Sequence, residues 1–251
     1  MIRALRGLSS ALAYYTIVPA GRSAEDGAPG VAALEWLPFV GALVGSIAGL
    51  AGYAAFAWLQ VPWAFLVAWA LTIGLTGALH VDGFLDACDG LFATASPRRR
   101  IEILKDVHHG TFAVAGMAIV AAFWLAALAA IAPGRFPLVL AFSGASARFA
   151  VMPVALAFSY ATSGAMARTF ASRPSLLSLI LNAVLVEALA WAIAPWALAL
   201  APAAMLVALA VAWWASRRLD GAVTGDVYGA AIVTTEVLLL LAVGVCLQRL
   251  G

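Results

Sequence analysis

The sequence predicts an all-α fold, a polytopic bundle of about seven transmembrane helices that forms one integral membrane domain over residues 1–251. Hydrophobic residues make up 65% of the chain and charged residues only 10%. A soluble protein carries about 25% charged residues, because water must wet its surface. The apolar stretches are also too long and continuous for barrel strands, which leaves helices as the spanning elements.

Seven apolar stretches are candidates for crossing about 30 Å of hydrocarbon. Four of them contain no charged residue: 36–59, 63–79, 112–132 and 196–214. Three more contain one charge each: 136–160 with Arg148, 176–194 with Glu187, and 227–247 with Glu236. The run 176–214 is too long for one span, so we expect a turn near Pro195, because proline ends helices. The short second stretch and this turn leave six or eight spans as alternatives.

Residues 1–20 are expected to form an amphipathic helix on the membrane surface, since Leu5, Leu8, Leu12 and Tyr15 recur at helical spacing. A signal peptide is the alternative, because arginines precede the apolar run 8–18.

The basic residues of the loops orient the bundle. With the N-terminus in the cytoplasm, eleven basic residues lie inside and only Arg135 and Arg249 lie outside, which predicts an inner-membrane protein with this orientation. The inner residues are Arg3, Arg6, Arg22, Arg98, Arg99, Arg100, Lys105, Arg168, Arg173, Arg217 and Arg218. The formal net charge of +2 is too small for a nucleic-acid-binding surface, so no nucleic-acid partner is expected.

The acidic residues gather in two segments that this topology places on the cytoplasmic face. Five of the twelve acids lie in one loop region: Asp82, Asp86, Asp89, Glu102 and Asp106. All three histidines accompany them: His80, His108 and His109. Three more acids accompany the last span: Asp220, Asp226 and Glu236. We therefore expect the two segments to meet at one site.

The first segment has a spacing typical of a metal site. On a helix, Asp82, Asp86 and Asp89 share one stripe, and three neighbouring carboxylates repel unless a cation compensates. Oxygen ligands suit Mg²⁺ or Mn²⁺, and Mg²⁺ usually bridges substrate phosphates. Gly83 and Gly90 would let a phosphate approach the backbone. The alternative is a solvated loop in which Asp and Gly form turns.

The flanking residues allow two interpretations each. Ser96 and Pro97 indicate a helix start, and the three arginines that follow would contact either anionic lipids or a polyphosphate substrate. Glu102 and Asp106 are either a second metal-facing pair or partners of those basic residues. His80 is either catalytic or an interfacial residue at the end of a span.

The second segment places acids at and within the last span. Asp226, next to Gly225, is expected to contact metal or phosphate. Glu236 lies two to three turns deeper, where a buried acid is a functional candidate, with pairing to Arg148 as the alternative. For Glu187 we expect a helix contact.

At these residues the chain resembles the cobalamin synthase family, the adenosylcobinamide-GDP ribazoletransferases. The resemblance extends over almost the whole chain. It is carried by Trp36-Leu37-Pro38-Phe39-Val40-Gly41, by Leu75-Thr76-Gly77-Ala78-Leu79-His80-Val81-Asp82-Gly83 through Asp89-Gly90, by Leu104-Lys105-Asp106 with Gly110-Thr111-Phe112, and by residues 221–236 with Thr224-Gly225-Asp226 and Glu236. Departures from the family pattern are Ala113, Ala222 and Thr162.

The resemblance implies that α-ribazole, or its 5′-phosphate, attacks the activated phosphate of adenosylcobinamide-GDP, releasing GMP, with Mg²⁺ as cofactor. The expected metal ligands are Asp82, Asp86, Asp89, Asp106 and Asp226. The expected catalytic residues are Asp82, Asp89 and His80, with Asp89 as the base. The expected substrate-binding residues are Arg98, Arg99, Arg100, Lys105, Thr224 and Glu236.

Two rival functions share part of this pattern. A CDP-alcohol phosphotransferase also uses a membrane-surface Asp/Gly cluster with Mg²⁺, but Asp86 stands where the Ala of its Asp-Gly-x-x-Ala-Arg opening would be. An ion-coupled transporter would use Asp82, Glu187 and Glu236 along a path, with acids spread near the midplane. The expected partners are the corrinoid-nucleotide and ribazole substrates and the lipid bilayer, and the sequence leaves a homo-oligomer open.

Overall fold

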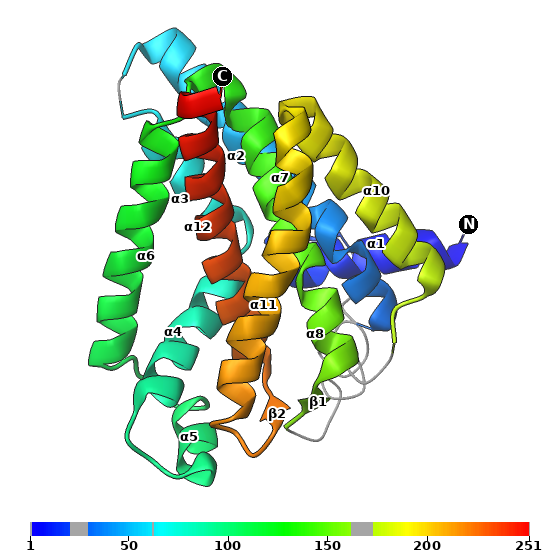
Figure 1. Cartoon of the computed structure of the whole chain (residues 1–251), viewed down its shortest axis with the longest axis vertical. Helices are drawn as coiled ribbons and strands as arrows, with labels where there is room; N and C mark the ends of the chain where they lie inside the picture. The colour runs from blue at the N-terminus through cyan, green and yellow to red at the C-terminus, as the bar shows by residue number, and fades with distance from the viewer. Residues whose placement is uncertain (1, 21–29, 62, 162–172, 251) are drawn as a thin grey trace.

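The computed structural model describes residues 2–20, 30–61, 63–161 and 173–250, and over these it consists of helices, the loops that join them and one pair of two-residue strands. Arg22, Arg168 and Thr162, which entered the sequence argument, lie outside the described residues. Six described helices are long and apolar enough to span a membrane. They are α2 (Val31–Leu59), α6 (Thr111–Ala129), α7 (Phe136–Phe149) continued by α8 (Val151–Ala157), α10 (Leu176–Ile193), α11 (Leu200–Ser216) and α12 (Gly225–Leu250). The predicted helical membrane bundle is confirmed (Figure 1).

The predicted second span is broken. Helix α3 (Phe65–Leu75) ends early, and α4 (Leu79–Phe92) leaves it at an angle of 85°. Between them Gly77 (φ 57°) and Ala78 (φ 59°) adopt the left-handed conformation, which costs alanine free energy. The second span predicted over 63–79 is therefore mainly α3, the first member of a bent pair, and a seventh span results only if α3 and α4 are counted together. Helix α4 carries the aspartate stripe away from the direction of α3.

The other weak element of the prediction, the turn at Pro195, is confirmed. Ala194 is extended (φ −177°, ψ 158°) between α10 and the short 3-10 helix η2 (Pro195–Ala199), which leads into α11. A second 3-10 helix, η1 (Pro133–Arg135), precedes α7.

Helix α1 (Ile2–Tyr15) lies across the long helices in Figure 1, as expected for a surface helix. Its 14 residues span about 21 Å at 1.5 Å per residue, too short for the hydrocarbon core. Leu5 is exposed, whereas Ala11 and Tyr15 are buried against the bundle. The amide of Ile17 donates to the carbonyl of Leu75 (2.9 Å), so the chain after α1 is fastened to the end of α3.

The bundle is built around a close crossing of α2 and α7. Three glycines at four-residue spacing, Gly41, Gly45 and Gly49, face the backbone of α7. A Cβ at Gly45 would overlap the carbonyl oxygen of Leu140. Small residues at such spacing let helices approach in lipid, where van der Waals packing replaces hydrophobic attraction between spans.

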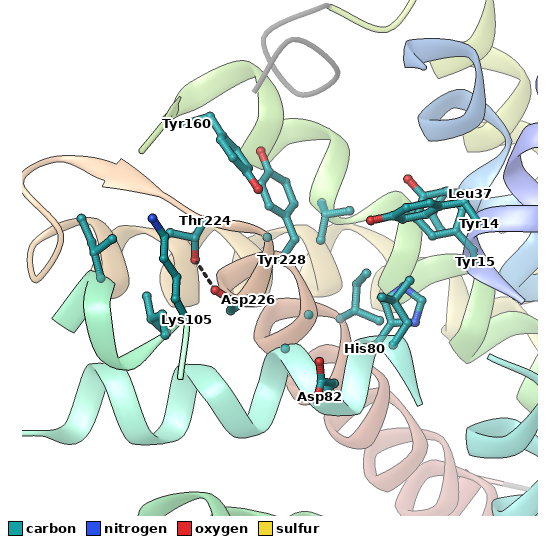
Figure 2. A pocket seen from close by; sticks show the side chains of 18 residues that line it. Tyr14, Tyr15, Leu37, His80, Asp82, Lys105, Tyr160, Thr224, Asp226 and Tyr228 are labelled. Carbon is teal, nitrogen blue, oxygen red and sulfur yellow. Dashed lines mark hydrogen bonds between the residues drawn. The ribbon is translucent and has the colours of Figure 1, made fainter. Parts of the chain in front are cut away.

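A short parallel strand pair joins two loops at the end of the bundle that carries α4. Strand β1 (Ser159–Tyr160) pairs with β2 (Ala222–Val223), and the amide of Ala161 donates to the carbonyl of Val223 (2.8 Å). Because β2 leads directly into α12, the pairing holds Tyr160 above the first turn of that helix (Figure 2).

A first prediction concerns the α2–α7 contact. Gly45→Ala should destabilise the protein by about 1–3 kcal/mol, because the added methyl overpacks a backbone contact. It should appear as a lower thermal unfolding temperature in detergent. Gly74→Ala on α3 is the matched control, since a Cβ there meets nothing within 4 Å. That control should be neutral or gain up to about 1 kcal/mol from helix propensity; equal unfolding temperatures for the two variants would contradict the packing argument.

Candidate active site

The candidate site is created where α4 crosses α12. A Cβ at Gly83 would lie 3.2 Å from the Cα of Asp226 and 3.4 Å from that of Gly229. A Cβ at Gly229 would lie 3.0 Å from the Cα of Gly83 and 3.0 Å from the carbonyl oxygen of His80. The space at Gly83 is thus filled by α12. The missing side chain admits a helix, but Gly83 also lines the cavity described next, so its predicted approach to a phosphate stays a prediction.

A cavity of about 300 Å³ opens at this crossing, with walls from α1, α4, β1, α12 and the segment around Lys105 (Figure 2). Asp82 of α4 and Asp226 of α12 both line it. The predicted meeting of the two acidic segments is therefore confirmed. Thr224 and Lys105 also lie in the wall, and the Thr224 hydroxyl donates to Asp226 Oδ2 (3.1 Å), the bond drawn in Figure 2.

The carboxylates at the crossing act on one another. The Asp86 carboxyl group is subject to the negative charges of Asp226, Asp82 and Asp89. His109 lies between two of them, with Nδ1 3.5 Å from Asp86 Oδ1 and Nε2 3.8 Å from Asp82 Oδ1. Sequence reasoning gave His109 no role, although its place next to the acidic segment was a signal. It can lower the repulsion when protonated.

These groups do not form a closed metal cage. Among the described residues, no three His, Cys, Asp or Glu side chains converge closely enough to hold a metal ion. Asp82, Asp86 and Asp226 nevertheless offer the oxygen donors that Mg²⁺ prefers. Because Mg²⁺ is often held by one or two carboxylates together with waters and substrate phosphates, an open arrangement fits its chemistry.

Asp89 is engaged in a structural contact. Its Oδ1 accepts from the amide of Ala113 (3.0 Å) and its Oδ2 accepts from the amide of Gly110. Gly110 is the N-cap of α6, so Asp89 satisfies amides that a helix start leaves without intrahelical partners. Asp89 does not line the cavity. Its predicted roles as base and metal ligand stay predictions.

Asp106 and Glu102 are exposed, and both are paired with neighbours. Hydrogen bonds from the ring and the amide of His108 hold the pKa of Asp106 below its usual range. A hydrogen bond from Arg99 (2.9 Å) likewise lowers the pKa of Glu102. The interpretation of Glu102 as a partner of the basic residues is confirmed, since Arg98 also lies 3.7 Å from it.

Helix α5 (Pro97–Ile103) starts as predicted, because the Ser96 hydroxyl accepts from the amide of Arg99 (3.4 Å). Arg100 is buried, and its guanidinium donates to the carbonyls of Ala95 (3.1 Å), Gly90 (3.0 Å) and Leu91. These last two belong to the final turn of α4, so Arg100 caps that helix. Its Nε and Nη1 thus bind backbone carbonyls of the protein, and its predicted substrate contact stays a prediction.

Gly90 also has a packing role. A Cβ there would lie 2.6 Å from Leu104 Cδ2 and 3.3 Å from the carbonyl of Arg100. The prediction that Gly90 admits a phosphate is wrong, because Leu104 and the α5 backbone fill the space.

A buried polar group lies behind the cavity. Arg148 donates from Nη1 to Glu236 Oε2 (3.0 Å), and its Nη2 lies 3.5 Å from Nδ1 of His80. The exposed fractions of these three residues are 3%, 7% and 7%. The alternative interpretation of Glu236, a pair with Arg148, is confirmed, and the predicted substrate contact of Glu236 stays a prediction. His80 itself reaches the cavity wall.

Four tyrosines line the cavity, and sequence reasoning missed all of them as site residues. Tyr14 and Tyr15 come from α1, Tyr160 from β1 and Tyr228 from α12. Burial, followed by the charge of Asp226, raises the pKa of Tyr160 to about 12. The same two causes raise the pKa of Tyr14. Tyr14, Tyr15 and Tyr160 are far in sequence from the acidic segments and left no signal that could have placed them here, whereas Tyr228 follows Asp226 by two residues and could have been considered.

Comparisons with known proteins agree on one family. The sequence model of cobalamin-5-phosphate synthase matches residues 7–244. A protein of Deinococcus radiodurans named adenosylcobinamide-GDP ribazoletransferase is 37% identical over 244 residues, covering 94% of this chain and 84% of that protein. Proteins with the same name from Geobacillus kaustophilus (33% identical; 95% of each chain) and Klebsiella pneumoniae (34% identical; 82% of this chain, 84% of that one) are also similar. No solved structure matches this chain.

A second prediction tests the role of Asp89. Asp89→Ala should speed amide hydrogen exchange over residues 110–115 and cost about 0.5–2 kcal/mol of stability, because the start of α6 loses its cap. Hydrogen exchange read by mass spectrometry measures the effect. The control is Asp106→Ala, whose side chain is hydrogen-bonded to His108 and not to the start of α6. Unchanged exchange at the start of α6 together with lost turnover would favour a chemical role for Asp89 instead.

Proposed function

Because this chain belongs to the cobalamin-5-phosphate synthase family, we propose that it transfers the adenosylcobinamide phosphate moiety of adenosylcobinamide-GDP to α-ribazole or α-ribazole 5′-phosphate, releasing GMP. The observation that carries the proposal at the level of the site is the crossing of α4 and α12. It brings Asp82 and Asp226 to one cavity that also has Lys105 in its wall. The relatives' names agree with this reaction.

The reaction is a displacement at phosphorus. A hydroxyl oxygen of the ribazole bonds to the phosphorus that carries the corrinoid, and the bond from that phosphorus to the oxygen of GMP breaks. The protein has to orient the two substrates, compensate the charge of the pyrophosphate and accept the hydroxyl proton. Asp82 is suited to accept the proton, because it lines the cavity and its side chain is 64% exposed.

Asp82, Asp86 and Asp226 would hold Mg²⁺, which supplies charge neutralisation and orientation of the pyrophosphate oxygens when it is bound. Lys105 would contact a phosphate oxygen from the cavity wall, and Thr224 keeps Asp226 oriented through its hydroxyl. Arg98 and Arg99 are exposed near the same end, at the start of α5, where they can attract anionic substrate or lipid.

The rivals have less support. The Asp-Gly-x-x-Ala-Arg opening of CDP-alcohol phosphotransferases is absent, and the chain matches a different family over most of its length. A transporter path through Glu187 finds no support, because Glu187 lines neither the cavity nor the polar group around Arg148.

We also propose that the site faces the cytoplasm at the inner membrane. The arginines of α5 and the two that follow α11, Arg217 and Arg218, belong to the end of the bundle that carries α5 and β2, and the positive-inside rule puts such an end in the cytoplasm.

A third prediction tests the carboxylates. Asp82→Asn and Asp226→Asn should each lower turnover at least about 100-fold, since both remove a charge from the cavity wall. Purified protein is assayed for GMP release with adenosylcobinamide-GDP, α-ribazole and Mg²⁺. Mg²⁺ should raise the unfolding temperature of the wild type and have little effect on either variant. The control is Asp220→Asn, an exposed residue with φ 53° that asparagine tolerates.

Two results would count against the assignment. Near-normal turnover in both variants would remove the carboxylates from the mechanism, and turnover only with a CDP-activated substrate would favour the lipid-synthesis rival.

A fourth prediction tests the orientation. In a Cys246→Ser background, Arg98→Cys should react with a membrane-impermeant maleimide only after the cells are permeabilised, because the Arg98 side chain is 93% exposed at the proposed inner end. Cys88 is buried and should stay unlabelled. Labelling of intact cells would reverse the proposed topology.

A further inference from the structure

We infer that the cavity beside Asp226 holds the aromatic base of the acceptor nucleoside, with Tyr15 and His80 as the polar contacts and the surrounding tyrosines as stacking surfaces. The inference rests on the proposed function and deepens it, because it says which of the two substrates enters the cavity. It also separates the cavity into a base subsite and a phosphate subsite at Asp82 and Asp226.

The first support is the aromatic character of the walls. Tyr160 and Tyr228 are stacked, with centroids 6.4 Å apart and planes at 27°. On the other side Tyr15 stacks on the His80 ring at 6.2 Å and 12°, and Tyr14 meets Tyr15 edge to face at 5.0 Å. Figure 2 shows the hydroxyl groups of Tyr14 and Tyr15 directed toward the side where Tyr228 lies. Flat heterocycles bind between such rings through their π faces.

The second support is independent and polar. The hydroxyl of Tyr15 and Nε2 of His80 are buried and have no hydrogen-bond partner among the described residues. Tyr15 is 4% exposed and His80 7%. Most buried polar groups in folded proteins are hydrogen-bonded, so two such groups in one cavity wall indicate a ligand that supplies the missing partners.

The neighbour of His80 determines what this ligand must offer. Arg148 Nη2 faces Nδ1 of His80 at 3.5 Å, and a guanidinium can only donate. Nδ1 is therefore the acceptor, and the proton of the neutral ring resides on Nε2. His80 presents a donor, and the Tyr15 hydroxyl can donate or accept. The matching ligand has an acceptor atom and few donors.

The rest of the lining selects among bases. Leu37, Leu79, Val151 and Ile232 contribute aliphatic surface. Guanine would place amino, N–H and carbonyl groups against that surface, where they would lose hydrogen bonds to water. The base of ribazole is a benzimidazole with apolar methyl groups and, once bonded to ribose, one free acceptor nitrogen. The cavity therefore favours the acceptor nucleoside over the guanosine part of the donor.

Size leads to the same assignment. A volume of about 300 Å³ is at the lower end of the range for ligand pockets and suits a nucleoside. A corrin macrocycle with its side chains is several times larger, so it would stay outside the mouth while its phosphate reaches Asp82 and Asp226. The two substrates would then approach the reacting phosphorus from opposite sides.

The experiment compares Tyr15→Phe, which keeps the ring and removes the hydroxyl, with Tyr53→Phe, the same change on an exposed tyrosine of α2. Tyr15→Phe should raise the KM for α-ribazole about three- to tenfold and leave the KM for adenosylcobinamide-GDP within about twofold. Tyr53→Phe should change neither. Direct titration of the wild type in detergent should detect binding of α-ribazole, and guanosine should bind at least about tenfold more weakly. Tyr160→Leu should lower the affinity for α-ribazole.

The outcomes separate this inference from the proposed reaction. A higher KM for adenosylcobinamide-GDP in place of α-ribazole would overturn the base assignment and leave the reaction intact. Equal binding of guanosine, or unchanged α-ribazole binding in both Tyr15→Phe and Tyr160→Leu, would also overturn it. Tyr15-dependent binding of α-ribazole by an enzyme that releases no GMP would support the subsite and refute the reaction alone.

Discussion

The close crossing of α4 and α12 is the constraint on which the candidate site depends. Gly83 and Gly229 let the two backbones touch, and this contact brings Asp82 and Asp226, far apart in sequence, to one cavity. Such proximity costs free energy through like-charge repulsion, part of which a protonated His109 can offset. The protein has few charged residues, yet it places several carboxylates at one helix crossing, where they repel one another. Such an arrangement suits the binding of a cation and a polyphosphate, and packing alone does not require it.

Much of this fold could be predicted from the sequence, because spanning helices are encoded in long apolar runs and their ends in local signals. The turn at Pro195 and the cap at Ser96 are of this kind, and each depends on a few adjacent residues. The break at Gly77 and Ala78 could not be predicted, since the apolar run continues through it and alanine gives no sign of a positive φ. Hydropathy reports burial in lipid and contains no information on the direction of a helix.

Only part of the site could be predicted, because the role of each charged residue also depends on the tertiary fold. Spacing on one helix placed the aspartates of α4 on a common stripe, but the role of each depends on what packs above it. Asp89 meets the start of α6, and Arg100 meets the end of α4, so both serve helix termini. A sequence read without its tertiary contacts cannot distinguish a charge that binds substrate from one that satisfies buried backbone groups. The tyrosines of α1 and β1 were missed because only the fold brings them beside Asp226.

The buried Arg148–Glu236 pair connects the interior of the bundle to the cavity through His80. A buried ion pair gains little net stability, because both charges lose their hydration. Its position directly behind His80 gives it another consequence, since the guanidinium that pairs with Glu236 also faces the imidazole and determines which ring nitrogen carries the proton. Glu236 keeps Arg148 in place. Gly41 has no side chain and so leaves room for the aliphatic part of Arg148, which makes the orientation of the arginine depend on the α2–α7 crossing. The glycine contacts that hold the spans together thus also set the chemistry of one wall of the cavity.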